Sequence, residues 1–514
     1  MADQMRDIFE PMQDVRVVNL GTGWAARVSS MLLADQGANV IEIVKPDRSK
    51  GPIDVFLDRG KDLLELDLKD SGAAARARDI AMTADVVIEN MRPGAVSDLS
   101  LDYASLARPD VIYISQPGFA AGDPNRNIPA WDGAINASVG VFTNLSPLGP
   151  LLGGEPVYSS IPMASAYGGV LGALSASLGL FNRQRCGEGQ YIEVPLADAV
   201  MSAMALLIAD IEGQPSRYYF PSIDNAVLQQ IFPVLRDLRG HMNDEHVAQI
   251  ASYVRGHGSP GLQNYECADG RHIFVCAIDH VLQTRRFLDA VGVLDQAISE
   301  GMVLESPYSS SADAGNNILQ AAKLKPAWRA RLISLIGAAI KKRPSHEWET
   351  VLRTANVPVT LVQTSAEWLA DPVHFASGVT TDLSDKTFGV VRQPGRFITI
   401  ESDSIRSPQL APRRDAGHDG FVFKDQSPAP SQSSQKATGG GMLDGLKVLD
   451  FSNIIAGPAT GRTLAEHGAD VIRIDPPAAP AGPFTTMWFG IDVNQGKRAL
   501  VLLSLIHISE PTRR

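Results

Sequence analysis

The sequence predicts an α/β protein whose main domain is built on a parallel β-sheet with helices on both faces. Up to about residue 200, short runs rich in β-branched residues alternate with helical patterns such as ARVSSMLLADQG. That alternation is typical of parallel strands joined by crossover helices. At 514 residues the chain is too long for one ordinary domain, so we expect several cores. The strand-like runs are VRVVNL, NVIEIV, ADVVIEN and DVIYIS.

Composition excludes several classes of function. The net charge is −11 and charged residues make up 20% of the chain, so nucleic acids and anionic membranes are poor partners. Cys186, Cys267 and Cys276 lack metal-binding spacing and are interpreted as reduced thiols of a cytoplasmic protein. The polar N-terminus is unlike a signal peptide, and no apolar run approaches the roughly 20 residues of a membrane span. We therefore expect neither a metal centre nor a membrane anchor.

The pattern changes after the first strands and helices. Residues 164–182 are small and apolar, which favours a buried helix packed closely against its neighbours. From about 226 to 345 the pattern is less regular, and YECADGRHIFVCAID predicts two strands joined by a tight turn at Asp269-Gly270. VPVTLV and FITI then return to strand character. We expect a large domain over 1–225, a smaller domain over 226–345, and a return segment over 346–425 that completes the large domain.

The last part of the chain contains a linker and a repeat. Residues 426–441 are dense in Pro, Ser, Gln and Gly and predict a flexible linker. The stretch that follows, LKVLDFSNIIAGPATGRTLAEHGADVIRID, repeats VRVVNLGTGWAARVSSMLLADQGANVIEIV without a gap, so that Val17 corresponds to Val448. We interpret residues 442–503 as the beginning of a second copy of the module. The tail, 504–514, fits nothing in the repeat and is interpreted as foreign sequence.

The loop GTGWAA (residues 21–26) has the glycine spacing of a dinucleotide-binding fingerprint. In the second copy the aligned stretch is SNIIAG, where bulkier residues replace the glycines that let a backbone approach a pyrophosphate. The second predicted strand also ends in VKP, without an acidic residue for a ribose. We expect no NAD or FAD site, and an NAD-dependent oxidoreductase is only a weak alternative.

These motifs resemble the family III CoA-transferases, which include formyl-CoA, carnitine and bile-acid CoA-transferases. The second copy carries the family's opening nearly intact, and the resemblance covers residues 15–412 of the first module. It implies a Rossmann-like large domain with an inserted smaller α+β domain. It also implies two modules interlocked like chain links, as a homodimer or as a pseudo-dimer within one tandem chain. The motifs of the first module are RGKDLLELDLKD, ADVVIENMRPG, VIYISQPGFAAGDP, GEGQYIEVPLADAV, CADGRHIFV and VPVTLVQTSAEWLADP.

The resemblance implies transfer of CoA between an acyl-CoA and a small organic carboxylate. In the family an aspartate attacks the thioester to form a mixed anhydride and then carries CoA as an enzyme thioester. The aligned position here is Ser165, and no Asp or Glu lies between Pro156 and Asn182. With no obvious general base, Ser165 is expected to be a small residue at a helix start, and the first module to be catalytically degenerate. The alternative is a non-catalytic scaffold that forms half of a tandem enzyme.

The resemblance also implies a set of CoA contacts. These lie in the loop after the first strand, at basic residues facing the phosphates, and along the pantetheine path. The alternative is that the lysines are ordinary solvated side chains and that ENMRPG is a turn ending a strand. Asp132 and Asp198 align with positions that are more structural than catalytic. The implied contacts are Trp24, Ala25, Lys45, Lys69, Asn90, Met91 and Arg92 in the first module, and Ile454, Ile455 and Ala456 in the second.

Overall fold

A computed structural model describes residues 7–142 (except 49), 158–208, 259–402 (except 279, 307, 309–313 and 321–322), 405–417 (except 408), 441–477 and 489–502, with isolated positions at 212, 234, 237, 241–243 and 423. The chain divides into two compact units. The first comprises Met1–Phe142, Tyr158–Met204 and Thr364–Leu443; the second comprises Thr143–Val157, Ala205–Gln363 and Asp444–Arg514. The predicted tail (504–514), all of the predicted linker except residue 441, and the predicted boundary at 225 lie outside the described residues.

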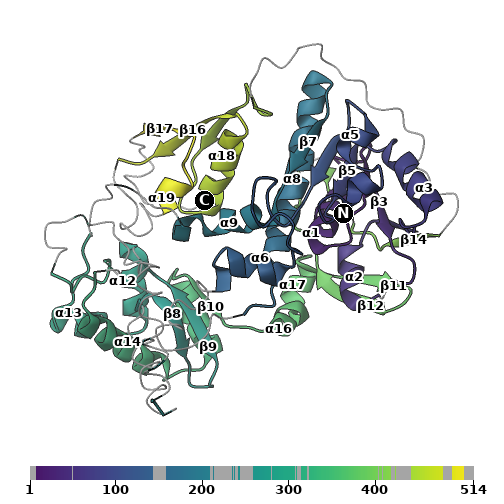
Figure 1. Ribbon diagram of the computed structural model, residues 1–514. Helices are drawn as coiled ribbons and strands as arrows, with labels where there is room; N and C mark the ends of the chain where they lie inside the picture. The colour runs from purple at the N-terminus through teal and green to yellow at the C-terminus, as the bar shows by residue number, and fades with distance from the viewer. Residues whose placement is uncertain are drawn as a thin grey trace. The chain divides into compact units, whose positions relative to one another are not determined.

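The first unit is organised by a parallel sheet, as predicted (Figure 1). Within the described residues this sheet has seven strands in the order β14-β4-β3-β2-β5-β6-β7, and every neighbouring pair is parallel. Parallel neighbours require crossover connections, and apolar, β-branched strands suit a sheet that is buried on both faces. The strands are β2 (Arg16–Asn19), β3 (Asn39–Val44), β4 (Asp62–Glu65), β5 (Val86–Glu89), β6 (Ile112–Ser115), β7 (Gln190–Glu193) and β14 (Arg414–Gly417).

Helices bury both faces of this sheet. Successive residues of a strand point to opposite faces, so Val17 packs in a cluster with residues of α1 and α8, whereas Val18 packs with residues of α3. Both valines are fully buried. The helices of this part are α1 (Trp24–Asp35), α2 (Pro52–Leu57), α3 (Ser71–Ala81), α4 (Ala95–Asp98), α5 (Tyr103–Leu106), α6 (Asp132–Ser138), α8 (Met163–Cys186) and α9 (Leu196–Ile208).

Helix α8 confirms the predicted close-packed helix. A Cβ added at Gly169 would lie 2.5 Å from Cβ of Val28, and one at Gly172 would lie 2.4 Å from Oγ of Ser29, so glycine lets α8 approach α1 closely. The expectation that no segment has the composition of a membrane span was wrong, because α8 is long and apolar enough. More than half of its apolar window is buried, as in the core helix of a globular fold.

The return segment is attached to the sheet through a buried arginine. Arg59 is fully buried and forms an ion pair with Asp35 of α1 at 2.5 Å. Its Nη1 donates to the carbonyl oxygen of Pro394 at 2.8 Å. A buried guanidinium needs such partners because unpaired burial of a charge is costly. The segment contains α16 (Ser365–Ala370), α17 (Pro372–Ala376), the antiparallel strands β11 (Thr380–Asp385) and β12 (Gly389–Pro394), and β13 (Ile405–Arg406), which pairs with β1 (Asp7–Ile8).

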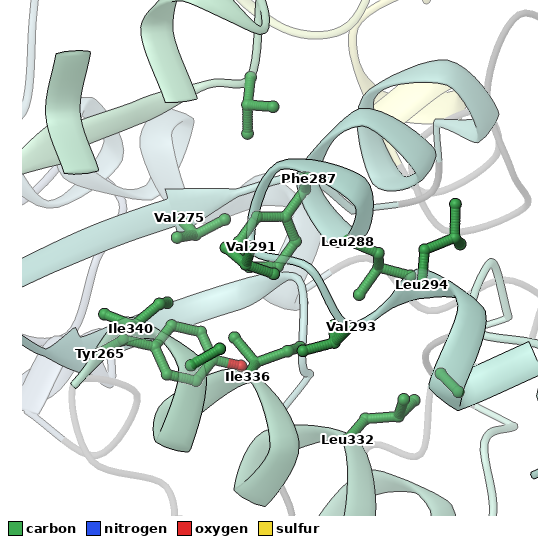
Figure 2. Packing of buried hydrophobic residues seen from close by; sticks show 14 of the residues in the cluster. Tyr265, Val275, Phe287, Leu288, Val291, Val293, Leu294, Leu332, Ile336 and Ile340 are labelled. Carbon is green, nitrogen blue, oxygen red and sulfur yellow. The ribbon is translucent and has the colours of Figure 1, made fainter. Parts of the chain in front are cut away.

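The second unit contains an antiparallel sheet with its own core. Its described strands are β8 (Leu262–Glu266), β9 (His272–Cys276) and β10 (Val359–Leu361), in the order β10-β9-β8. The predicted hairpin is confirmed, with Gly270 at a φ of 77° in the turn. Figure 2 shows Tyr265 and Phe287 within the apolar cluster between this sheet and its helices. The helices are α12 (Val281–Ala290), α13 (Leu294–Ser299), α14 (Pro326–Ile340) and α15 (Ser345–Thr354).

The sequence repeat folds as a βαβ unit followed by a third strand. The strands form a parallel sheet in the order β15-β16-β17, as β2, β3 and β4 do in the first module. Leu449 and Phe451 are 61% and 68% exposed, whereas the corresponding Val18 and Leu20 are 0% and 1% exposed. The elements are β15 (Lys447–Asp450), α18 (Ala456–Glu466), β16 (Asp470–Asp475), α19 (Phe489–Asp492) and β17 (Arg498–Val501).

The variant Arg59→Met tests the attachment of the return segment. It leaves the buried Asp35 carboxylate without its ion-pair partner, so we expect the free energy of unfolding to fall by about 3–5 kcal/mol. Arg392→Met is the matched control, because Arg392 pairs with Asp382 between β11 and β12 at the surface, and we expect a change below about 1 kcal/mol. Urea denaturation of both variants gives the comparison. Equal losses would contradict a special role for Arg59.

Candidate functional site

The candidate residues of the first module lie at one edge of the parallel sheet. In a parallel sheet the carboxyl ends of the strands meet at the same edge. The chain runs from β2 to β3 and β4 on one side, and continues through β5, β6 and β7 on the other. The strand order therefore reverses between the neighbouring strands β2 and β5. Open α/β sheets bind ligands at the carboxyl edge beside such a reversal. Trp24 and Ala25 follow β2, Lys45 follows β3, Lys69 follows β4, and Asn90, Met91 and Arg92 follow β5.

Their exposure differs. Trp24, the first residue of α1, is 38% exposed. Lys45, Lys69 and Arg92 are exposed charged residues. Ala25 is fully buried in an apolar cluster and offers no side-chain surface. Asn90 and Met91 are half-buried. Contact of these residues with CoA stays a prediction, and so does the alternative of ordinary solvated lysines.

The glycine loop after β2 is filled by Asn90. The Gly23 N–H donates to Oδ1 of Asn90 at 3.2 Å, and the Gly21 N–H donates to Oδ1 of Asn19 at 2.8 Å. A Cβ at Gly23 would lie 2.0 Å from Nδ2 of Asn90, and one at Gly21 would lie 2.4 Å from its Oδ1. The side chain of Asn90 thus accounts for both glycines. The N–H groups of both glycines are thus bonded within the protein.

Ser165 has a carboxylate partner that sequence reasoning missed. Ser165 is buried in the first turn of α8, and its Oγ donates to Oδ2 of Asp132 at 2.5 Å. Its backbone N–H donates to Oδ1 of the same carboxylate at 2.9 Å. Asp132 is the first residue of α6, so this pair joins α6 to α8. The alignment of Asp132 with a family position was the available signal, but it did not reveal the partner 33 residues away.

The carboxyl ends of β5, β6 and β7 carry a second polar group of residues. Glu89, Ser115 and Glu193 are neighbours in register across these strands. Burial raises the pKa of Glu89, which accepts hydrogen bonds from Oγ of Ser115 and from the Met91 N–H, the latter at 2.8 Å. Glu89 therefore fixes the turn that carries Asn90. An acidic residue at the end of an apolar strand was the only sequence signal.

In the second copy the corresponding loop is more exposed. Ile454 is 52% exposed and has a φ of 74°, a left-handed conformation that β-branched residues rarely adopt. Ile455 and Ala456 follow it on exposed positions at the start of α18. A Cβ at Gly457 would lie 2.2 Å from Cβ of Ser452, which explains this glycine. Within the described part of the chain, no three His, Cys, Asp or Glu residues are grouped to hold a metal ion.

Comparison with known proteins assigns the family. The model of CoA-transferase family III matches residues 12–219, 220–418 and 443–503. The chain belongs to CoA-transferase family III. It is 29% identical over 507 residues to the CoA-transferase/lyase DddD of Marinomonas sp. (strain MWYL1), covering 96% of this chain but only 59% of that protein.

Two further relatives cover most of a single module. The chain is 23% identical to succinate–glutarate CoA-transferase of Agrobacterium fabrum, over 78% of this chain and 92% of that one. The crystal structure of Rv3272 from M. tuberculosis superposes with a TM-score of 0.58 at 18% identity, covering 80% of this chain and 98% of that one. At this identity the superposition shows the fold alone.

Titration with nucleotides tests the role of the glycine loop. Because the N–H groups of Gly21 and Gly23 are bonded to Asn19 and Asn90, we expect no saturable binding of NAD, NADP or FAD. Isothermal titration calorimetry measures this, with a known dehydrogenase as the positive control. A micromolar Kd for any of these nucleotides would show that the loop does serve as a dinucleotide site.

Proposed function

We propose that the chain is part of a cytoplasmic enzyme that moves CoA between an acyl-CoA and a small carboxylic acid. Membership of CoA-transferase family III carries this proposal. Relatives of this family are named for CoA transfer, among them the succinate–glutarate enzyme. The identities of the acyl donor and the acceptor acid are not part of the proposal, because relatives at these identities differ in substrate.

Binding of CoA is proposed at the carboxyl edge of the large sheet. CoA carries several phosphate charges, and a chain with a net charge of −11 must attract it locally. Lys45, Lys69 and Arg92 place exposed positive charge at that edge, on loops that follow β3, β4 and β5. In the second copy, Ile454 and Ile455 present apolar surface in the loop proposed for the adenine. No metal and no nicotinamide cofactor are needed for this reaction.

We infer that the first module does not supply the nucleophile. Acyl transfer through a mixed anhydride needs a free carboxylate at the start of α8, where this chain has Ser165. The neighbouring carboxylate, Asp132, has one oxygen bonded to the Ser165 hydroxyl and the other to its N–H. A serine paired only with a carboxylate lacks the imidazole that commonly activates such nucleophiles. The catalytic aspartate would then belong to a second module.

A non-catalytic scaffold is the second candidate. The observation that favours it is the Ser165–Asp132 pair, which fits a structural connection between α6 and α8 as well as a silent site. In that case the first module would complete the fold and one CoA pocket only. The two candidates differ in whether this chain turns over acyl-CoA, which activity assays measure.

Activity assays test the silent first module. We expect no exchange of CoA between a panel of acyl-CoA donors and organic acids, because no free carboxylate stands at the start of α8. Mass spectrometry detects the new acyl-CoA. Exchange that is abolished in Ser165→Ala would overturn the inference.

Ser165→Asp is the complementary variant. It restores the family's residue beside Asp132, and any exchange that it gains, absent from Ser165→Ala, would show that the remaining site is intact.

Light scattering tests the proposed interlocked assembly. The second copy leaves Leu449 and Phe451 largely exposed. Large exposed apolar surfaces drive association. We expect the 514-residue chain to form homodimers or larger assemblies. A monodisperse monomer at micromolar concentration would count against the interlocked arrangement.

A further inference from the structure

A fully buried lysine connects three elements beside the glycine loop of the first module. Lys61, directly before β4, donates from Nζ to the carbonyl oxygen of Arg27 at 2.9 Å and to Oε2 of Glu42 at 2.9 Å. Arg27 lies in the first turn of α1, and Glu42 lies on β3. Burial lowers the pKa of Lys61, and Glu42 opposes that shift. A lysine in this position needs its carboxylate partner, because an unpaired buried charge is strongly destabilising.

The same carboxylate connects to the other end of the loop. Asn19, the last residue of β2, donates from Nδ2 to Oε2 of Glu42 at 2.8 Å. Its Oδ1 accepts the Gly21 N–H at 2.8 Å. The loop between β2 and α1 is thus held at the Gly21 N–H through Asn19, and at the helix that follows it through Lys61.

The second copy contains the same connections with the carboxylate in a different place. Lys497 directly precedes β17 as Lys61 directly precedes β4, and these two strands have the same register against β16 and β3. Lys497 donates to the carbonyl oxygen of Pro458, the counterpart of Arg27, at 2.6 Å. It also forms an ion pair with Asp450 at 2.7 Å. Asp450 is the counterpart of Asn19, and its Oδ1 accepts the Ser452 N–H at 2.9 Å, as Asn19 does for Gly21.

The residue in register with the last residue of the first strand also differs between the copies. Glu42 is in register with Asn19 between β2 and β3, and its counterpart Arg473 is in register with Asp450 between β15 and β16. The carboxylate is therefore on β3 in one copy and on β15 in the other, while the lysine and its helix carbonyl are retained. Lys61 pairs with Glu42, and Lys497 pairs with Asp450. Because each buried lysine has a carboxylate partner from a different strand, we infer that the arrangement is retained in both copies.

One helix position contacts the arrangement in both copies. Ser30 of α1 donates from Oγ to Oε2 of Glu42 at 3.3 Å. Its counterpart on α18 is Gly461, where a Cβ would lie 2.7 Å from Oδ2 of Asp450. The helix therefore has a serine that donates to the carboxylate on β3 in the first copy, and a glycine that leaves space for the carboxylate on β15 in the second.

We propose that Lys61 and Lys497, each with its carboxylate, are positioning residues that fix the loop preceding the first helix of their module. We call each arrangement a loop clamp: Asn19, Glu42 and Lys61 in the first module, and Asp450 and Lys497 in the second. The clamp rests on the proposed function in one respect only, that this loop lies against CoA. It acts through the loop and touches no reacting atom.

Exchange of the carboxylate between strands tests the clamp. Glu42→Gln removes the carboxylate, Asn19→Asp adds a second one, and the double variant moves it to the place that it has in the second copy. We expect amide hydrogen exchange of the peptide containing Gly21 to rise about tenfold or more in each single variant and to return to near the wild-type rate in the double variant. Peptides from β11 and β12 are the internal reference, because a general loss of stability would raise exchange there too.

Two further variants keep the test decisive. Asp382→Asn alters an exposed ion pair on β11 and should leave the loop unchanged. If Glu42→Gln does not fold, Asn19→Ala removes the contact with Gly21 while Lys61 and Glu42 stay paired, and it should raise exchange in the loop alone. Unchanged exchange in the single variants, or a double variant no better than they are, would overturn the proposal.

Binding of CoA to the same proteins, measured by calorimetry, separates the clamp from the proposed function. If the wild-type chain binds CoA, the single variants should weaken binding and the double variant should restore it. If the wild-type chain does not bind CoA while the exchange pattern appears as expected, the clamp stands and the CoA site assigned to this module fails.

Discussion

The arrangement of the first module depends on one buried carboxylate, Asp58, which is fully closed to water. Arg27 of α1 and Arg48 of the loop after β3 each approach it to 2.7 Å, and Arg413 of the return segment lies 3.8 Å from it. Burial alone would raise the pKa of Asp58, but Lys61, Arg27 and Arg48 hold it below its usual range. Segments that share a buried charge cannot separate without exposing it unpaired, so helix, loop and return segment keep a single arrangement.

That rigidity is what a site at the edge of a sheet requires. Loops bind ligands well when the elements beneath them are fixed, and the loops after β2 and β5 stand on such elements. Glu89 accepts the Met91 N–H in the loop after β5, and Asn90 of that loop accepts the Gly23 N–H in the loop after β2. The family's fold is thus retained around Ser165, which lies in the first turn of α8 with Asp132 as its hydrogen-bond partner.

Sequence reasoning predicted the parts that depend on local pattern. Alternating strands and helices predicted the parallel sheet, and Asp269-Gly270 predicted the hairpin, because period and turn chemistry are local properties. The hydrogen-bond partners of the candidate site residues could not be predicted from the sequence. The pairing of Ser165 with Asp132, or of Gly23 with Asn90, joins residues 33 and 67 positions apart, and nothing in either stretch specifies the other. For helix α8, the small residues predicted the close packing, but the partner, α1, could not be read from the sequence.

Because β14 pairs with β4, the edge of the sheet at β4 is completed only after β14 has been synthesised. Arg414 bonds to Asp62 across 352 residues of sequence, and it does so on the outer strand of the sheet. On the ribosome, β4 therefore waits as an open edge for roughly 20–70 s, at about 5–20 residues per second, before its neighbour emerges. Unpaired strand edges of that kind are recruiting points for chaperones and for aggregation. The amino-terminal half of the module is thus a nascent-chain intermediate whose protection is encoded more than three hundred codons downstream.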